Sequence, residues 1–477
     1  MSNQEYEAVI GLEVHAELKT QSKIFCACPT DFGAPPNTQC CPVCMGYPGT
    51  MPVLNRRAVE LCIKAGLALG CKITRISRTD RKQYFYPDLP KAYQISQDEA
   101  PLCRDGELTF SAETGQRTVC IKRIHIEEDA GKLIHAGEKT LIDHNRCGVP
   151  LIEIVSAPDL RTPEQASAYL RALRGVLLAC GVSDCRMQEG SLRCDVNVSL
   201  RKKGCDALGV RTEIKNLNSF SFVEKALRYE IKRQSDLLGR GEHVESTTCR
   251  FDPASGKTYP MRSKESTVDY RFLPEPDLPP ICIRDEDIEA IRATLPELPR
   301  MRAARMRADY GLTDYDTDLL VSDPALADFF ECGVGETKYP KIMVNLLLSD
   351  LLRHCGSDPF FSPVSAHRLA ELATLLGEST VNSSTAKKLL LRLIDGDIDL
   401  FRIVADEGLA QIRDREKLSA VVCEVLAANP RAVADYRNGK TAALRALQGQ
   451  AMARTAGRAE PVLLEELFCA MLAQSEK

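Results

Sequence analysis

Residues 190–201, GSLRCDVNVSLR, alternate between apolar and polar side chains along the stretch. A period of two is typical of a β-strand with one buried face and one open face. The apolar set is Leu192, Cys194, Val196, Val198 and Leu200, and the polar set is Arg193, Asp195, Asn197, Ser199 and Arg201. We therefore expect a strand that turns its apolar set toward a core.

Two further stretches have the same period and similar polar side chains. In residues 9–18, VIGLEVHAEL, one face of the expected strand carries Ile10, Leu12, Val14 and Leu18, and the other carries Glu13, His15 and Glu17. In residues 210–220, VRTEIKNLNSF, one face carries Arg211, Glu213 and Lys215. A solvated polar face is the ordinary explanation for any one such strand. Three strands together predict a sheet face on which carboxylates, cations and amides alternate.

The 477 residues are too many for a single core and predict two to three domains. The composition changes near residue 275, where a proline-rich stretch precedes Ala-, Leu- and Arg-rich sequence with helical periodicity. We expect a sheet-rich, mostly antiparallel α+β domain over residues 1–294, with helices at 56–69 and 162–180. An all-helical middle domain at 295–405 and a helical tail at 406–477 should follow.

The N-terminus, MSNQEYEAVIGLEVH, has acidic residues where a signal peptide needs a basic flank. No segment approaches the ~18 consecutive apolar residues of a membrane span. We expect a cytoplasmic protein whose 20 cysteines stay reduced and act as metal ligands or core residues. A net charge of −4 excludes a uniformly basic nucleic-acid binder, so contact with a polyanion requires local basic patches.

Five cysteines lie close together in the stretch KIFCACPTDFGAPPNTQCCPVCMGYPG, residues 23–49. Cys26 and Cys28 form one short-spaced pair, and Cys41 and Cys44 form another. Four thiolates complete a tetrahedral zinc shell with no open position, so we expect a structural zinc site in the loop 26–44. Cys40 is an alternative to Cys41 as the third ligand. Buried or incidental thiols are the other explanation.

Glu13 and His15 put an oxygen and a nitrogen ligand side by side on one strand face. The run IHIEEDAGK, residues 124–132, adds Glu127, Glu128 and Asp129. So dense an acidic cluster favours a bound cation, and oxygen-rich ligation favours magnesium that carries nucleotide phosphates.

Residues 75–97, RISRTDRKQYFYPDLPKAYQISQ, interleave cations with aromatic rings. The cations are Arg75, Arg78, Arg81, Lys82 and Lys91, and the rings belong to Tyr84, Phe85, Tyr86 and Tyr93. Cations bind phosphates and rings stack on bases, so the mixture suits a nucleotide or an RNA end. An irregular loop anchored by aromatic residues explains the composition equally well. The sequence contains no P-loop and no G-x-G-x-x-G motif.

The ordered set of motifs resembles the B subunits of aspartyl/glutamyl-tRNA(Asn/Gln) amidotransferases. The blocks are GLEVHAEL (11–18), PVCMGYPGTMPVLN (42–55), DRKQYFYPDLPKAYQISQ (80–97), IEEDAGK (126–132), NRCGVPLIEIVSAPDL (145–160), MQEGSLRCDVNVSLR (187–201) and TEIKNLNSF (212–220). Residues 435–461 are similar to the family's YqeY-like C-terminal domain. The resemblance covers nearly the whole chain.

This resemblance implies a heterotrimer with an amidase A subunit and a small C subunit. The B subunit would use ATP to phosphorylate the carboxylate of Glu on tRNA(Gln) or of Asp on tRNA(Asn). Ammonia from the A subunit would then displace phosphate to give the amide, so the enzyme would be a C–N ligase. The sequence leaves open which mischarged tRNA is used.

The resemblance also implies roles for individual residues. Glu13 and His15, with Glu127 or Glu128, match the family's magnesium site, and Arg81 and Lys82 lie in its phosphate-proximal motif. The implied catalytic set is Glu13, His15, Lys82, Glu128 and Asp195, and the implied nucleotide-binding set is Arg81, Lys82, Arg193 and Lys215. The cysteine pattern is similar to that of the zinc-containing members.

An alternative is a zinc-stabilised tRNA-binding subunit without chemistry of its own. The tail supports RNA binding, because residues 431–460 carry six basic residues against Asp435 and Glu460. These are Arg431, Arg437, Lys440, Arg445, Arg454 and Arg458. Against a purely passive role, the acidic strand face would repel RNA unless a cation compensates it.

Overall fold

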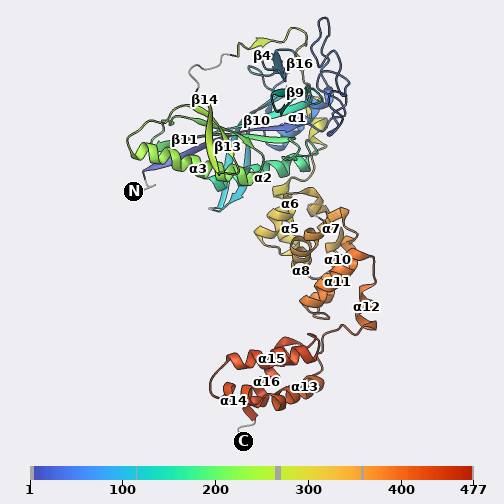
Figure 1. Ribbon diagram of the computed structural model, residues 1–477. Coiled ribbons are helices and arrows are strands. Elements are labelled where there is room, and N and C mark those ends of the chain that lie inside the picture. The colour runs from blue at the N-terminus through green and yellow to red at the C-terminus, as the bar shows by residue number, and fades with distance from the viewer. Residues whose placement is uncertain (1–4, 114, 264–269, 356–358, 475–477) are drawn as a thin grey trace. The chain divides into compact units, whose positions relative to one another are not determined.

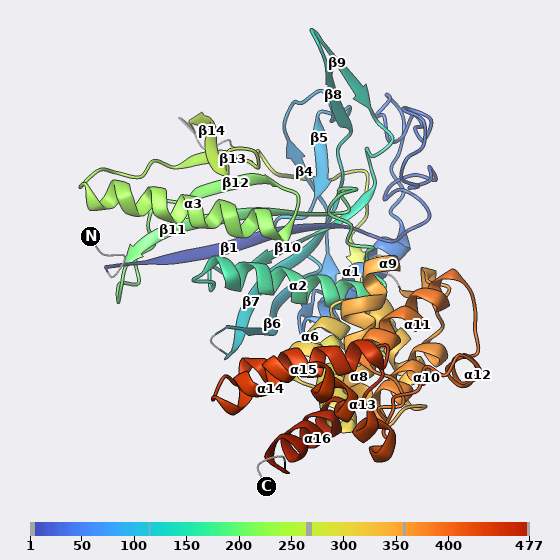
Figure 2. The same cartoon turned by 60° about the horizontal axis from the view of Figure 1, so that its bottom comes forward.

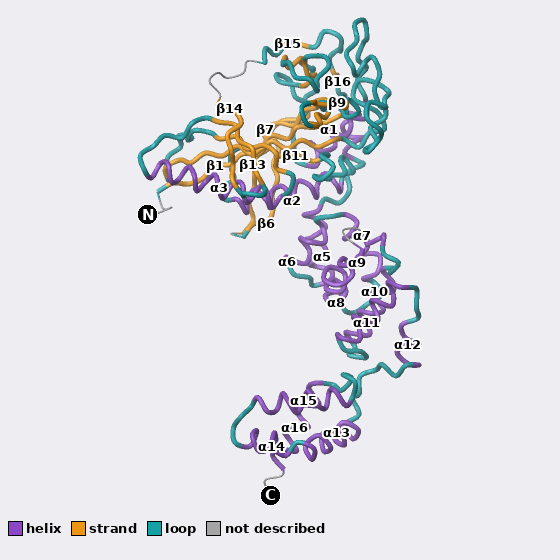
Figure 3. The backbone as a smooth tube through the Cα atoms, viewed as in Figure 1, coloured by secondary structure: helices purple, strands orange, loops and turns teal. Residues whose placement is uncertain are grey.

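The computed structural model describes residues 5–113, 115–263, 270–355 and 359–474. The chain divides into two compact units, Met1–Arg302 and Ala303–Lys477 (Figure 1). All the named strands belong to the first unit, whereas the second is built from helices (Figure 3). The predicted α+β class with a helical C-terminal part is confirmed. In the described part of the chain, no helix has the length and apolar character needed to cross a membrane.

A nine-stranded sheet forms the centre of the first unit, in the order β14-β13-β12-β11-β1-β10-β7-β6-β2. Its strands are β1 (Tyr6–Glu17), β2 (Lys72–Ile73), β6 (Cys103–Ala112), β7 (Gly115–Glu128), β10 (Pro150–Ser156), β11 (Leu192–Lys202), β12 (Thr212–Leu217), β13 (Thr247–Asp252) and β14 (Lys257–Ser263). Neighbouring strands are antiparallel except for the parallel pair β12–β13. The mostly antiparallel sheet was therefore predicted correctly.

Three helices pack on the apolar face of this sheet: α1 (Arg56–Ala68), α2 (Pro163–Ala179) and α3 (Phe220–Gly239) (Figure 2). All three begin where the sequence provides a cap, because the side chains of Asn55, Thr162 and Ser219 accept hydrogen bonds from the first helical turn. The alternating apolar residues of β1 and β11 join the helices in one buried core. The polar residues of the same strands therefore lie on the opposite face.

Smaller elements complete the first unit. β4 (Asp80–Gln83), β5 (Tyr93–Ser96) and β15 (Leu273–Pro274) form a three-stranded sheet, while β3 (Ile76–Ser77) pairs with β16 (Ile281–Cys282). β8 (Lys132–Ala136) and β9 (Lys139–Asp143) form a separate hairpin. Helix α4 (Asp285–Arg292) follows β16 in the chain. Residues 75–97 thus contribute three short strands, β3, β4 and β5, to these smaller sheets.

The helices of the second unit bury two separate apolar clusters. The first cluster lies between residues 306 and 404 and the second between residues 418 and 472. The α-helices are α5 (Pro299–Tyr310, which begins in the first unit), α6 (Asp314–Val321), α7 (Pro324–Val334), α8 (Pro340–Asn345), α9 (Leu352–Cys355), α10 (Ala366–Gly377), α11 (Ser383–Asp395), α12 (Leu400–Asp406), α13 (Arg415–Ala428), α14 (Pro430–Arg437), α15 (Ala442–Arg454) and α16 (Pro461–Gln474). A π-helical stretch, Leu346–Leu351, joins α8 to α9. The domain boundaries at residues 294 and 405 stay predictions.

Tyr169 of α2 is 0% exposed, and its ring packs edge-on against Phe110 of β6 with the ring centroids 6.0 Å apart. Its hydroxyl group makes no hydrogen bond with any described residue. A buried hydroxyl without a partner loses its hydration and gains nothing in return. The ring, rather than the hydroxyl, therefore stabilises the contact between α2 and the sheet.

We predict that Tyr169→Phe leaves the free energy of unfolding unchanged or raises it, because the substitution removes only the unpartnered hydroxyl. Tyr169→Ala should instead cost about 3–5 kcal/mol, as for other large aromatic truncations in a core. Urea denaturation of both variants measures this, with Tyr315→Phe at an exposed position as the matched control. A loss above about 1 kcal/mol for Tyr169→Phe would mean that the hydroxyl is hydrogen-bonded.

Candidate metal centres and basic surface

His15, Glu127 and Glu153 meet on the polar face of the sheet. They come from the adjacent strands β1, β7 and β10, and the strand register sets His15 directly opposite Glu153. His15 Nε2 lies 3.3 Å from Glu127 Oε1 and 3.7 Å from Glu153 Oε2. One ligand atom from each residue lies within 4.8 Å of the others. Two carboxylates and one imidazole in this arrangement could hold a divalent cation.

His125 lies behind this group and is almost fully buried. Its Nε2 is 3.2 Å from Glu153 Oε2 and 3.8 Å from Glu127 Oε2. Although burial opposes protonation, the two carboxylates raise the pKa of His125 to about 9. Burial likewise opposes ionisation of Glu153, but His125 and then His15 hold its pKa well below the usual range. The carboxylate of Glu153 is therefore ionised at neutral pH.

The sequence reasoning missed both Glu153 and His125. Two features of the sequence could have indicated them. Glu153 is the single charged residue in the run PLIEIVS, residues 150–156, and His125 lies two positions before Glu127. Strand periodicity would have set His125 on one face with Glu127.

Glu127 and Glu128, which the sequence left as alternatives, have different surroundings. Consecutive residues of a strand point to opposite sides, and only Glu127 lies beside His15. Glu128 is buried, accepts a 2.8 Å hydrogen bond from the backbone N–H of Ile95, and forms an ion pair with Lys91. Its carboxylate therefore already has partners away from His15, Glu127 and Glu153.

Glu13 lies on the same sheet face as His15, but its carboxylate is not among the three groups whose ligand atoms lie within 4.8 Å of one another, and its role as a magnesium ligand stays a prediction. It accepts a 2.9 Å hydrogen bond from Asn197 Nδ2 and lies opposite Asp195 on β11. Lys215 Nζ is 3.0 Å from Asp195 and 3.1 Å from Glu213. Burial and then the neighbouring carboxylates raise the pKa of Glu13, so its carboxylate is a stronger base than an exposed one.

Two further carboxylates lie close together: Glu17, the last residue of β1, and Asp129, which follows β7. Asp129 forms ion pairs with Arg193 and with Arg146, whose Nε is 3.4 Å away. Burial and the charge of Asp129 raise the pKa of Glu17 to about 8. Arg193, predicted to bind nucleotide, is thus already paired with one carboxylate.

Arg81, also predicted to bind nucleotide, is held in a tight set of contacts. Its guanidinium donates two hydrogen bonds to Glu275, at 2.8 and 2.9 Å, and one to Asp277 at 3.1 Å. It also lies over the ring of Tyr93, 4.2 Å from the centroid. These contacts join β4 to the segment that contains β15.

Lys82 makes no ion pair with any residue that the structure describes. Its Nζ lies over the ring of Tyr270, 4.9 Å from the centroid, and its charge helps to lower the pKa of Glu153. The other cations of residues 75–97 are all paired: Arg75 with Asp285, Arg78 with Asp80 and Glu99, Arg81 with Glu275, and Lys91 with Glu128. Lys82 is therefore a cation near Glu153 with capacity to bind an anion.

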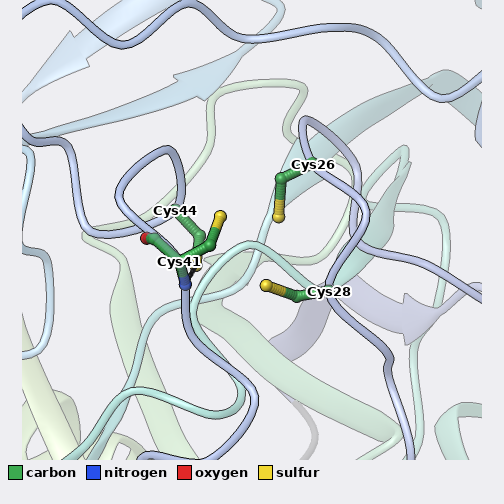
Figure 4. Close-up of side chains that lie close together, drawn as sticks. All are labelled: Cys26, Cys28, Cys41 and Cys44. Carbon is green, nitrogen blue, oxygen red and sulfur yellow. Dashed lines mark hydrogen bonds between the residues drawn. The ribbon is translucent and has the colours of Figure 1, made fainter.

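The sulfur atoms of Cys26, Cys28, Cys41 and Cys44 converge, all within 4.8 Å of one another (Figure 4). Cys40 is not part of this group, and its Sγ lies 3.9 Å from Asn145 Oδ1. The backbone N–H of Cys41 donates to Cys44 Sγ at 3.2 Å.

A hydrogen bond from Cys26 is the main cause that lowers the pKa of Cys44 to about 4, whereas burial raises the pKa of Cys28 to about 11. Four sulfur donors at this spacing fit a tetrahedral zinc ion.

Three of the six basic residues in the tail have neither an ion-pair partner nor a side-chain hydrogen bond among the described residues. Arg431, Arg437 and Arg445 lie on α14 and α15, outside the buried cluster of the tail. The others have local partners, since Lys440 pairs with Asp435, Arg454 pairs with Glu424, and Arg458 donates to the carbonyl of Thr455. Among the six, the first three are the ones whose charge is best available to an outside anion.

Comparison with known proteins gives matches along nearly the whole chain. A family model described as the GatB/GatE catalytic domain matches residues 8–289, and one described as the GatB domain matches residues 328–472. One relative, from Caldanaerobacter subterraneus subsp. tengcongensis, is named as the B subunit of aspartyl/glutamyl-tRNA(Asn/Gln) amidotransferase. It is 50% identical over 467 residues, which cover 97% of this chain and 98% of that protein. The protein of the same name from Carboxydothermus hydrogenoformans is 48% identical over 478 residues, covering 98% and 99%. The chain therefore belongs to the family of aspartyl/glutamyl-tRNA(Asn/Gln) amidotransferase B subunits.

Proposed function

We propose that this chain is the catalytic B subunit of a heterotrimeric, tRNA-dependent amidotransferase, with an amidase A subunit and a small C subunit as partners. It uses ATP to phosphorylate the side-chain carboxylate of Glu on tRNA(Gln), of Asp on tRNA(Asn), or of both, and then forms the amide with ammonia from the A subunit. The observation that carries this proposal is the group of His15, Glu127 and Glu153 with the cation of Lys82 nearby. The names of the relatives support the substrate class.

The reaction needs two displacements. A carboxylate oxygen of the aminoacyl group attacks the γ-phosphorus of ATP and ADP leaves; ammonia then attacks the acyl carbon and phosphate leaves. His15, Glu127 and Glu153 would hold Mg²⁺, which when bound offsets the charge of the phosphoryl group. The ammonium group of Lys82 binds phosphate oxygens, and Glu13 takes the proton that ammonia loses on forming the amide.

We predict that Glu153→Gln lowers the rate of amidation by about 10²–10³-fold, because the charge of one metal ligand is lost at similar side-chain volume. Glutamine hydrolysis by the partner subunit should persist. The measurement is amidation of each mischarged tRNA by the assembled heterotrimer across a MgCl₂ series. Glu289→Gln, at an exposed position of α4, is the matched control.

Glu127→Gln and Glu128→Gln extend this experiment to the two neighbouring carboxylates. Glu127→Gln should raise the Mg²⁺ concentration needed for half-maximal rate, whereas Glu128→Gln should leave that concentration unchanged. A wild-type rate in Glu153→Gln would exclude the proposed metal site. It would favour the alternative, a zinc-stabilised tRNA-binding subunit without catalysis.

We also predict one structural zinc ion per chain, bound by Cys26, Cys28, Cys41 and Cys44. Cys41→Ser should lose the metal and Cys40→Ser should keep it, because the Cys41 sulfur, and not that of Cys40, converges with the other three. Elemental analysis of the purified variants gives the stoichiometry, and thermal unfolding with and without a chelator gives the stabilisation. Loss of zinc from Cys40→Ser with retention in Cys41→Ser would show that the third ligand is Cys40.

The tail is proposed to bind the tRNA backbone through Arg431, Arg437 and Arg445. Replacing these three together by Gln should weaken tRNA binding, and should flatten the dependence of log affinity on log salt by up to about one unit per residue. The double variant Lys440→Gln, Arg454→Gln is the control, because both of its cations are already paired. Equal salt slopes for the triple variant and the wild type would exclude RNA binding by these residues.

A further inference from the structure

Lys23 is a fully buried lysine that contacts both halves of the cysteine group, with 0% of its surface exposed. Its backbone N–H donates a 2.9 Å hydrogen bond to the carbonyl of Cys28, and its Nζ lies 3.7 Å from Cys44 Sγ. The ammonium group also donates to the carbonyl of His144 at 3.3 Å. One residue thus joins the loop of the first cysteine pair to a sulfur of the second.

A buried ammonium group requires a counter-charge, because an isolated charge loses its favourable hydration when it is buried. Lys23 pairs with no carboxylate in the described parts of the chain. The acceptor in contact with it that is able to carry a negative charge is the sulfur of Cys44. A neutral carbonyl alone does not compensate the charge, so the burial of Lys23 points to a thiolate.

The cysteine group, in turn, requires a positive charge nearby. Four thiolates around one Zn²⁺ would carry a net charge of −2. A buried cation fixed beside one of the sulfur atoms would offset part of that charge. Lys23 is in this position, with its Nζ 3.7 Å from Cys44 Sγ.

We propose that Lys23 is a positioning residue of the cysteine centre: its ammonium group donates an N–H···S hydrogen bond to the Cys44 thiolate and slows the loss of the metal. This inference rests on the zinc site advanced above as part of the proposed function. It adds a residue that lies outside the four-cysteine pattern and that no spacing rule would identify.

The test compares Lys23→Met with the wild type in the purified full-length chain. Removing a hydrogen-bonding partner outside the ligand shell typically weakens metal binding by about 10–100-fold, so we expect zinc release to a chromogenic chelator to be faster by a factor in that range. Lys19→Met, at an exposed position four residues earlier, should release zinc at the wild-type rate. Release from Lys23→Met at the wild-type rate would overturn the inference.

Two further variants separate charge from packing. Lys23→Arg retains the positive charge and should restore slow release, whereas Lys23→Gln has an N–H group without charge and should not. In cobalt-substituted protein, the thiolate-to-metal charge-transfer band should move to longer wavelength in Lys23→Gln and return in Lys23→Arg. Should Lys23→Met fail to fold, this pair decides the question, and equal rates and bands in the two would overturn the inference.

The outcomes also separate this inference from the zinc proposal. Wild-type protein that binds no zinc contradicts the zinc site and the role of Lys23 together. Wild-type protein that binds one zinc, with unchanged release in the Lys23 variants, contradicts the role of Lys23 alone.

Discussion

The antiparallel pairing of β1 with β11 fixes the face of the sheet on which each candidate site residue lies. Its register sets Glu13 opposite Asp195 and His15 opposite Arg193. Because side chains alternate along a strand, a slip of one residue would turn the carboxylates into the core and the isoleucine and leucine side chains into solvent. Burial of the apolar face against α1, α2 and α3 therefore also holds the polar groups in position. Core packing and site geometry are set by the same register.

This link explains why the polar face could be predicted from sequence. Glu13, His15 and Asp195 stand at alternate positions of strands with a clear period of two, so their common face follows from the pleat. Glu153 was missed because it is the one charged residue in an otherwise apolar strand, and such a run is typical of a fully buried strand. The choice between Glu127 and Glu128 depends on the register of β7 against β10, which no local pattern specifies.

The carboxylate partners of several cations are far away in the chain, so the sequence alone does not show which cations are paired. The resemblance to the family assigned Arg81 to a phosphate-proximal motif, yet the carboxylate partners of Arg81, Glu275 and Asp277, are 194 and 196 residues away in the chain. Its role in nucleotide binding stays a prediction. For the cysteines, the short spacings indicated the four residues whose sulfur atoms converge, whereas the sulfur of Cys40 lies beside Asn145. The helical second unit followed from composition and periodicity, but which of its arginines are paired depended on tertiary contacts.

The order of β1 and its two sheet partners along the chain has a consequence for biosynthesis. Its two sheet partners, β10 and β11, end at residues 156 and 202, so the first strand leaves the ribosome long before either neighbour exists. At about 5–20 residues per second, the strand waits about 10–40 s for its second partner. An unpaired apolar strand is prone to associate with other chains. Glu13, His15 and Glu17 interrupt its apolar sequence with polar, ionisable groups and so discourage such association during that interval. The residues on this face thus protect the nascent strand before the fold that uses them has formed.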